Sequence, residues 1–426
     1  MQKSSGIGGK MQKRKGGVTA AKGYYAAAAE AGIKYSGRND MALIYSEAPC
    51  LAAGMFTSNI VKAAPVQFDR KQIDSFPYAR AIIVNSGIAN ACTGSDGLDV
   101  CRIEARAASK ALGINENEVL LGSTGVIGMQ LPVEKLEAGI MALAAAKDHS
   151  AKAGTAAERA IMTTDTVPKE CAYTFTIDGN GADAPEVTVT LGGMSKGSGM
   201  IHPNMCTMLC YVTTDVAITK ELLDEAVRSV VPDTFNMISV DGDTSTNDTI
   251  ICLANGLAGN PVINEKNGDY EQFVEALKAL CADLARKMAS DGEGASKLIE
   301  THVVNADTKE NARKLAKSVI GSNLVKAAVF GKDANWGRII CALGYSGVDF
   351  DPEKVDLYYV SEDGEKSILV CSQGADSPYS EDKATQLLSG KVVTILCDMN
   401  SGSESATAWG CDLTYDYVKI NADYRS

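Results

Sequence analysis

The residue best suited to act as a nucleophile is Thr207, near the middle of the chain. A glycine-rich loop at residues 197–199 and Pro203 precede it, and an apolar run that predicts a buried strand begins at Met208. A threonine that cleavage places at the start of a chain carries its own base, because the freed α-amine has an ordinary pKa of about 7.7–8.0. The residues alone leave an alternative open, in which Thr207 is an ordinary β-branched residue of a strand.

Two other stretches carry groups that could stabilise a developing negative charge. Residues 118–128 predict a strand and then a turn at Ser123, Thr124 and Gly125, which would present a hydroxyl beside a backbone N–H. Such donors form an oxyanion hole. Residues 163–166 place three threonines around one aspartate. Either stretch could instead close a turn or cap a helix.

Glu293 stands between two glycines, just after a helix predicted over residues 270–290. Glycine has no side chain and tolerates conformations that other residues avoid, so this carboxylate could lie in a confined place that has room for backbone but not for neighbouring side chains. The residues favour the other interpretation, in which Glu293 is a solvated cap of a following helix.

The composition is that of a globular protein. Of 426 residues, 45% are hydrophobic and 22% are charged, which is enough for a core in two lobes. A formal net charge of -12 argues against a nucleic-acid partner and suits a small-molecule substrate better, because phosphate binding needs clustered basic residues. No run approaches the ~20 apolar residues of a membrane span, and nothing resembles a signal peptide, so we expect a cytoplasmic protein without a membrane partner.

Cysteine and histidine usage argues against metal chemistry. The twelve cysteines are scattered, mostly within apolar runs, and this pattern predicts reduced residues in the core. The three histidines are too few for a histidine-rich metal site, and none accompanies a Gly-x-Ser-x-Gly motif. We therefore expect neither a metal nor a bound cofactor.

The pattern of predicted elements indicates an α+β fold. Residues 1–16 are polar and are expected to lie outside the folded part, which should begin near Gly17. Residues 79–85 predict a strand whose end carries Asn85 and Asn90, which either close turns or lie where a ligand approaches the backbone. Helices are predicted over residues 103–112, 132–146, 219–231, 270–290 and 309–320, a hairpin over 172–177 and 186–191, and a strand over 412–420. No repeat or linker separates the lobes, so we expect them to be intimately joined.

Several stretches together resemble the ornithine acetyltransferase family, also called glutamate N-acetyltransferase, of arginine biosynthesis. They are residues 123–128, 163–166, 196–209, 331–338 and 420–426. The resemblance runs from about Gly17 to the last residue and makes the nucleophile interpretation of Thr207 the stronger one. It implies a mixed α/β sandwich of the ornithine acetyltransferase and DmpA-like superfamily.

The resemblance also implies how the chain is processed. It implies self-cleavage between Cys206 and Thr207, which divides the folded chain into an alpha segment, residues 17–206, and a beta segment, residues 207–426. The segments would remain folded together, in a heterotetramer of two of each. The family usually has alanine where this chain has Cys206 and another small residue where it has His202. Both departures flank the expected cleavage site and therefore bear on the rate of processing.

The site residues follow from the same resemblance. It implies that Thr207 is the nucleophile and that Thr124 and Gly125 form the oxyanion hole. It implies substrate contacts at Thr163, Lys196, Thr207, Glu293, Asn421 and Ser426.

The implied activity is acetyl transfer from N2-acetyl-L-ornithine to L-glutamate through an acetyl-threonine, with ping-pong kinetics. The sequence leaves open whether acetyl-CoA is a second acetyl donor. One alternative is an N-terminal-nucleophile aminopeptidase or amidase of related fold, in which water replaces glutamate. Another is a small-molecule-binding protein that has lost processing.

Overall fold

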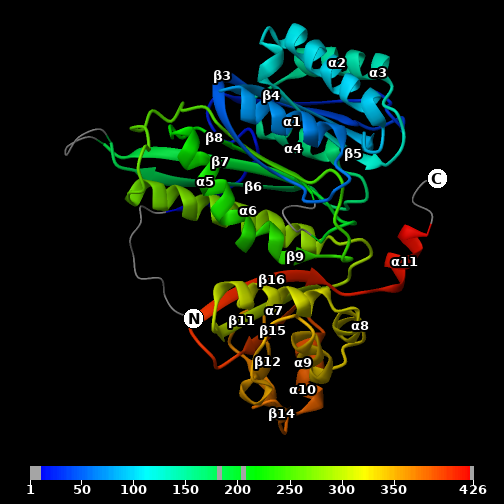
Figure 1. Cartoon of the computed structure of the whole chain (residues 1–426), viewed down its shortest axis with the longest axis vertical. Coiled ribbons are helices and arrows are strands. Elements are labelled where there is room, and N and C mark those ends of the chain that lie inside the picture. The colour runs from blue at the N-terminus through cyan, green and yellow to red at the C-terminus, as the bar shows by residue number, and fades with distance from the viewer. Residues whose placement is uncertain (1–10, 180–184, 203–207, 423–426) are drawn as a thin grey trace.

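The computed structural model describes residues 11–179, 185–202 and 208–422. The predicted nucleophile Thr207, its predecessor Cys206 and the terminal Ser426 lie outside the described residues. Most of the described chain forms two β-sheets with helices packed against them (Figure 1).

Within the described residues, nine strands form the first sheet. In chain order they are β1 (Gln12–Arg14), β2 (Tyr24–Ala29), β3 (Met41–Phe56), β4 (Ala79–Ile88), β5 (Val119–Val126), β6 (Lys169–Ile177), β7 (Val187–Lys196), β8 (Leu209–Thr214) and β10 (Thr249–Ala254). Their spatial order is β1-β6-β7-β8-β10-β3-β4-β5, and β2 also pairs with β3. The sheet is mixed, since β8 runs parallel to β10 and β4 parallel to β5, whereas β7 is antiparallel to β8. The strands β8 and β10 thus lie between β7 and β3, which precede them in the chain.

The second sheet has the order β14-β13-β12-β15-β11-β16-β9. Its strands are β9 (Ile238–Ser239), β11 (Leu298–Ala306), β12 (Asp356–Val360), β13 (Ser367–Ser372), β14 (Ala375–Asp376), β15 (Val392–Asp398) and β16 (Glu404–Cys411). It too is mixed, because β11 is parallel to β15 and antiparallel to β16.

Helices cover both sheets and fill the space between them. They are α1 (Ala64–Ser75), α2 (Gly94–Leu112), α3 (Val133–Ala146), α4 (Ala151–Ile161), α5 (Lys220–Val230), α6 (Gly268–Ser290), α7 (Lys309–Gly321), α8 (Asn323–Gly331), α9 (Trp336–Gly344), α10 (Glu381–Leu388) and α11 (Tyr415–Asn421). Figure 1 shows α6 between the two sheets, and this helix contacts β6 and β7 on one side and β16 on the other.

One hydrophobic cluster joins the two lobes. It contains Leu191 of β7, Leu280 and Leu284 of α6 and Val303 of β11, all buried. The prediction of an α+β fold with mixed sheets and closely joined lobes is confirmed.

The Asn267 side chain caps α6 by accepting a hydrogen bond from a backbone N–H, and acidic residues lie in the first turn of the helix.

Most of the predicted helices and the hairpin are confirmed. The helices predicted over residues 219–231, 270–290 and 309–320 are α5, α6 and α7, and the hairpin is the antiparallel pair β6 and β7. The helix predicted over residues 103–112 is longer, because α2 begins at Gly94. The described cysteines are buried except for Cys92 and Cys341, in agreement with the prediction that most of them are core residues.

The folded part begins before Gly17, earlier than predicted. Residues 12–14 form β1, which pairs with β6 at the edge of the first sheet. The side chains of β1 are exposed, so its polar sequence shows no burial pattern. Backbone hydrogen bonds to β6 and an ion pair between Lys13 and Asp283 of α6 hold the strand.

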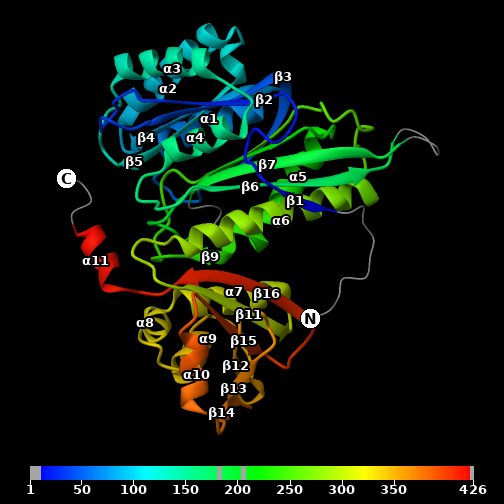
Figure 2. The same cartoon turned by 180° about the vertical axis from the view of Figure 1, so that it is seen from behind.

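The strand predicted over residues 412–420 is wrong. The carboxylate of Asp412 accepts hydrogen bonds from the backbone N–H groups of Ser296 and Lys297, which turns the chain out of the sheet, and α11 then begins at Tyr415. Figures 1 and 2 show α11 running from the end of β16 toward the first lobe. The terminal segment therefore approaches the first lobe as a helix.

Among the described residues, no helix combines the length and the apolar character needed to cross a membrane.

Candidate active site

Six of the predicted site residues line a single pocket of about 390 Å³. They are Thr124, Gly125, Thr163, Lys196, Glu293 and Asn421. These residues come from β5, the loop after α4, the end of β7, the loop after α6 and α11. The fold thus brings together residues that are almost 300 positions apart in the sequence.

Thr124 and Gly125 lie in β5 and not in a turn after it, which corrects the prediction for residues 118–128. They pair with Ser86 and Gly87 of the parallel strand β4. Gly125 has φ +129, and a Cβ there would lie 2.2 Å from the carbonyl carbon of Gly87. Glycine is therefore required for steric reasons, and a hydroxyl and a backbone N–H follow one another at the pocket wall.

Asn247 is a pocket residue that the sequence analysis missed. Its Nδ2 donates to the backbone oxygens of Ala89, at 2.6 Å, and Ser123, at 2.8 Å. The amide therefore joins the ends of β4 and β5 beside Thr124. A polar run over residues 241–248, between two apolar runs, is the signal in the sequence that could have directed attention to it.

Asn85 and Asn90 close local structure, which settles the alternative left open for them. Asn85 Nδ2 donates to the oxygen of Ile88 at 2.9 Å, and Asn90 Nδ2 donates to the oxygen of Gly97 at 3.1 Å. Neither asparagine lines the pocket of the candidate site.

Lys196, the last residue of β7, is buried at the pocket wall and 8% exposed. Its Nζ lies 3.9 Å from Oδ2 of Asp165. Burial lowers the pKa of Lys196, Asp165 opposes this effect and Lys169 adds to it. The long distance to Asp165 leaves the ammonium able to bind a carboxylate in the pocket.

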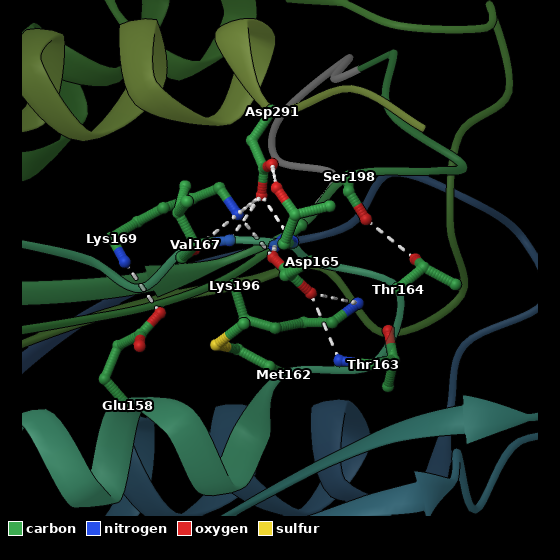
Figure 3. Close-up of polar contacts among 12 residues, drawn as sticks. Glu158, Met162, Thr163, Thr164, Asp165, Val167, Lys169, Lys196, Ser198 and Asp291 are labelled. Atoms are coloured by element: carbon green, nitrogen blue, oxygen red, sulfur yellow. Dashed lines mark hydrogen bonds and ion pairs between the residues drawn. The ribbon is translucent and has the colours of Figure 1, made fainter. Parts of the chain in front are cut away.

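A buried ionic network lies behind this lysine (Figure 3). Nζ of Lys169 is 2.7 Å from Oδ1 of Asp165 and 2.6 Å from Oδ2 of Asp291, and the side chains of Lys169 and Asp165 are fully buried. Burial would raise the pKa of Asp165, but Lys196, Lys169 and the N–H of Gly197 together lower it to about 2. Asp165 is therefore ionised at neutral pH, and it anchors the backbone at Gly197 through a 2.8 Å hydrogen bond.

This network shows what the threonine cluster at residues 163–166 does. Thr163 lines the pocket, Thr164 shares a 2.7 Å hydrogen bond with the hydroxyl of Ser198, and Thr166 binds Asp291 through its N–H and hydroxyl. The loop after α4 is thereby fixed to the loop after β7.

Glu293 is buried, so the cap interpretation that the residues favoured is wrong. The element that follows it is the strand β11, and Glu293 is only 6% exposed. Its N–H donates to the oxygen of Ser198, and its Oε2 accepts a 2.7 Å hydrogen bond from Nδ2 of Asn421. A Cβ on Gly199 would lie 2.3 Å from the carboxyl carbon of Glu293, so this glycine makes room for the carboxylate.

The described neighbours of the predicted nucleophile lie beside the pocket. A cavity of about 30 Å³ is lined by Met208, by Ile201 and by the pocket residues Thr124 and Lys196. Burial, and to a smaller extent Lys317, lowers the pKa of His202 to about 4, so this residue is neutral at neutral pH. No group of three or more His, Cys, Asp or Glu residues that could hold a metal ion occurs in the part of the chain that the structure describes.

Comparison with known proteins finds relatives that match nearly the whole chain. The ArgJ family model matches residues 25–426. The arginine biosynthesis bifunctional protein ArgJ of Symbiobacterium thermophilum is 51% identical over 413 residues, which cover 96% of this chain and 99% of that one. The ArgJ 1 protein of Clostridium acetobutylicum is 50% identical over 395 residues, covering 93% and 94%. A crystal structure of arginine biosynthesis bifunctional protein ArgJ from Bacillus halodurans matches at 45% identity and a TM-score of 0.48, over 50% of this chain and 98% of that chain.

Proposed function

The chain belongs to the ArgJ family, the acyltransferases of arginine biosynthesis, and from this premise we propose that Thr207 is its nucleophile. The chain transfers an acetyl group from N2-acetyl-L-ornithine to L-glutamate. The family match favours transfer to an amine over hydrolysis by an aminopeptidase of related fold.

One observation carries the assignment of the site. The six described residues to which the resemblance gives a role line one pocket, and Met208, which follows Thr207 in the chain, lines the adjoining cavity. Successive Cα atoms are about 3.8 Å apart, so the Cα of Thr207 is separated by only that distance from a residue that lines the cavity. This proximity supports Thr207 as the attacking group.

The proposed reaction proceeds in two steps. Oγ of Thr207 bonds to the acetyl carbon while its proton passes to the α-amine that cleavage has freed. The oxyanion accepts hydrogen bonds from the hydroxyl of Thr124 and the N–H of Gly125, the C–N bond breaks, and ornithine leaves with the proton. The amine of glutamate then attacks the acetyl-threonine ester, giving N-acetylglutamate and restoring the hydroxyl.

Charged residues in the pocket suit the two amino-acid substrates. Lys196 would bind the α-carboxylate that both substrates share. Glu293 would hold an ammonium, either that of the ornithine side chain or the freed amine of Thr207. We assign Asn421, which binds Glu293, and Ser426 to recognition of the same amino-acid group, together with Thr163.

Processing and assembly are part of the proposal. Cleavage between Cys206 and Thr207 frees the α-amine, and two copies of each segment would form the heterotetramer. We further propose acetyl-CoA as a second acetyl donor, with no bound cofactor, and the cytoplasm as the location of the enzyme.

A trapped intermediate tests the proposed function. Incubating processed protein with N2-acetylornithine and no glutamate should add one acetyl group to the fragment that begins with Thr207, because ornithine departs before the acceptor binds. Mass spectrometry of that fragment locates the label, and acetyl-CoA in place of acetylornithine tests the second donor. Initial rates that require both substrates in one complex, together with an unlabelled fragment, would contradict the mechanism.

Replacing Thr124 with valine should lower kcat by about 10²–10³, because the variant keeps the shape of the side chain and removes one oxyanion donor. The rate of N-acetylglutamate formation measures the effect. Thr188→Val is the matched control, since Thr188 is an exposed threonine at the opposite end of β7 from Lys196. Equal rates for the two variants would remove Thr124 from the oxyanion hole.

A further inference from the structure

The chain just before the predicted cleavage site is held by one neighbouring segment, residues 239–249, which we call the strap. The N–H of Val240 donates to the oxygen of Ile201 at 2.6 Å, and the hydroxyl of Thr244 donates to the oxygen of His202 at 2.9 Å. The side chain of His202 also shares a 2.9 Å hydrogen bond with the hydroxyl of Ser239. The strap therefore fixes both the backbone and a side chain on the upstream flank.

Asp241 of the strap adds two charge-assisted hydrogen bonds. Its Oδ2 accepts a hydrogen bond from the N–H of Met200 at 2.6 Å, and its Oδ1 accepts one from the N–H of Ile201 at 2.8 Å. Met200 has φ +55, an uncommon conformation for a residue with a side chain, so these contacts hold the backbone in a shape that it would not readily adopt alone. The hydroxyl of Tyr417 in α11 donates to the same carboxylate at 3.3 Å.

The same strap holds the downstream flank. The N–H of Thr249 donates to the oxygen of Met208 at 2.7 Å, where β10 begins to pair with β8. The strap is itself anchored, because the buried ammonium of Lys326 donates to the oxygen of Val240 and Asn59 donates to the oxygen of Thr244. The described residues on both sides of the segment 203–207 are thus bound to one fixed element.

We propose that the strap positions the bond between Cys206 and Thr207 for self-cleavage, with Asp241 and Thr244 as its upstream positioning residues. This inference rests on the self-cleavage proposed above. In that reaction Oγ of Thr207 bonds to the carbonyl carbon of Cys206 and the peptide C–N bond breaks. The hydroxyl proton goes to the departing α-amine, and water then hydrolyses the ester to leave a carboxyl group on Cys206.

An intramolecular attack of this kind depends on the orientation of its reacting groups. A misplacement of about 1 Å can lower a rate by about 10²-fold. Holding both flanks on one element limits the conformations open to the residues between them, which would raise the fraction that is ready to react. After cleavage, the contacts to residues 200–202 would keep the new carboxyl end beside the site.

Asp241→Asn tests the upstream contact. Asparagine has the same shape but one acceptor oxygen in place of two, so one of the two backbone N–H groups loses its partner. We expect the rate of cleavage to fall about tenfold or more, because hydrogen bonds to a charged group are among the strongest in proteins. The full chain is synthesised in a cell-free system, and the loss of the full-length band is followed on a denaturing gel. Asp243→Asn is the matched control, since the exposed Asp243 makes only a backbone contact to Asp241.

Thr244 provides a second test that does not depend on the folding of Asp241→Asn. Thr244→Val should slow cleavage, whereas Thr244→Ser keeps the hydroxyl and should restore the wild-type rate. Thermal unfolding of each variant shows whether the fold is intact.

The outcomes separate this inference from the proposed function. Cleavage of Asp241→Asn and Thr244→Val at the wild-type rate would overturn the role of the strap and leave the nucleophile assignment standing. Equal slowing of Thr244→Val and Thr244→Ser would overturn the role of the Thr244 hydroxyl. If the wild-type chain does not cleave, the proposed processing fails and the role of the strap fails with it.

Discussion

Thr207→Ala should leave the chain uncleaved and abolish acetyl transfer. The variant lacks the hydroxyl that attacks both the peptide bond before residue 207 and the acetyl group of the substrate, and without cleavage there is no free α-amine to accept a proton. Loss of a nucleophile that works with its base lowers kcat by about 10⁴–10⁶. A denaturing gel reports cleavage, and N-acetylglutamate formation from N2-acetylornithine reports transfer.

Thr207→Ser is the matched control, because serine keeps the hydroxyl and removes only a methyl group. It should yield two fragments, the second beginning at residue 207, and should retain measurable transfer. Cleavage of the alanine variant at the same bond would show that another group breaks the chain, and transfer by that variant would remove Thr207 from the chemistry.

Lys169→Met should lower the free energy of unfolding by about 3–5 kcal/mol, the usual result of removing one partner from a buried ion pair. The ammonium of Lys169 lies between the carboxylates of Asp165 and Asp291, and its removal leaves both charges buried without their common counterion. Methionine keeps the length of the side chain, so the loss reflects charge more than packing. The midpoint of urea unfolding measures the change.

Lys314→Met is the control for this experiment. Lys314 pairs with Glu310 at 2.7 Å within α7, but both side chains are largely exposed to solvent. Solvent screens a pair between exposed side chains, so the pair adds little to stability and the control should unfold close to the wild type. Similar midpoints for the two variants would show that the buried network adds no more than a surface pair.

The sequence predicted the elements whose residues follow a regular pattern. The helix α6 has a capping asparagine and apolar residues at helical spacing, and the hairpin of β6 and β7 alternates around a glycine-rich turn, so both are found where they were expected. The strand β1 escaped prediction because its residues are polar and exposed, and its partners in β6 and α6 are distant in the sequence. The region after β16 was misread because the contacts that turn it out of the sheet come from Ser296 and Lys297, more than a hundred residues away.

The same division applies to the candidate site. The resemblance to a family supplied six of the residues that line the pocket, and all of them except Glu293 lie in the stretches that carry the resemblance. Residues that act through distant contacts carried no such signal. Asp165 was noted only as a polar residue among threonines, and its place between two lysines follows from the packing of α4, β6 and β7. Asn247 and Asp241 depend likewise on strands that meet only in the folded chain.

The order of strands in the first sheet has a consequence for the cleaved protein. The strands β8 and β10 follow the proposed cleavage site in the chain, yet they lie between β7 and β3, which precede it. The two pieces would therefore be interleaved within one sheet, and neither could leave without breaking hydrogen bonds on both edges of this central pair. Folding before cleavage is an event within one molecule, whereas folding after cleavage requires two molecules to meet and so depends on concentration. Cutting the bond would make folding a step that the protein completes once, before it becomes an enzyme.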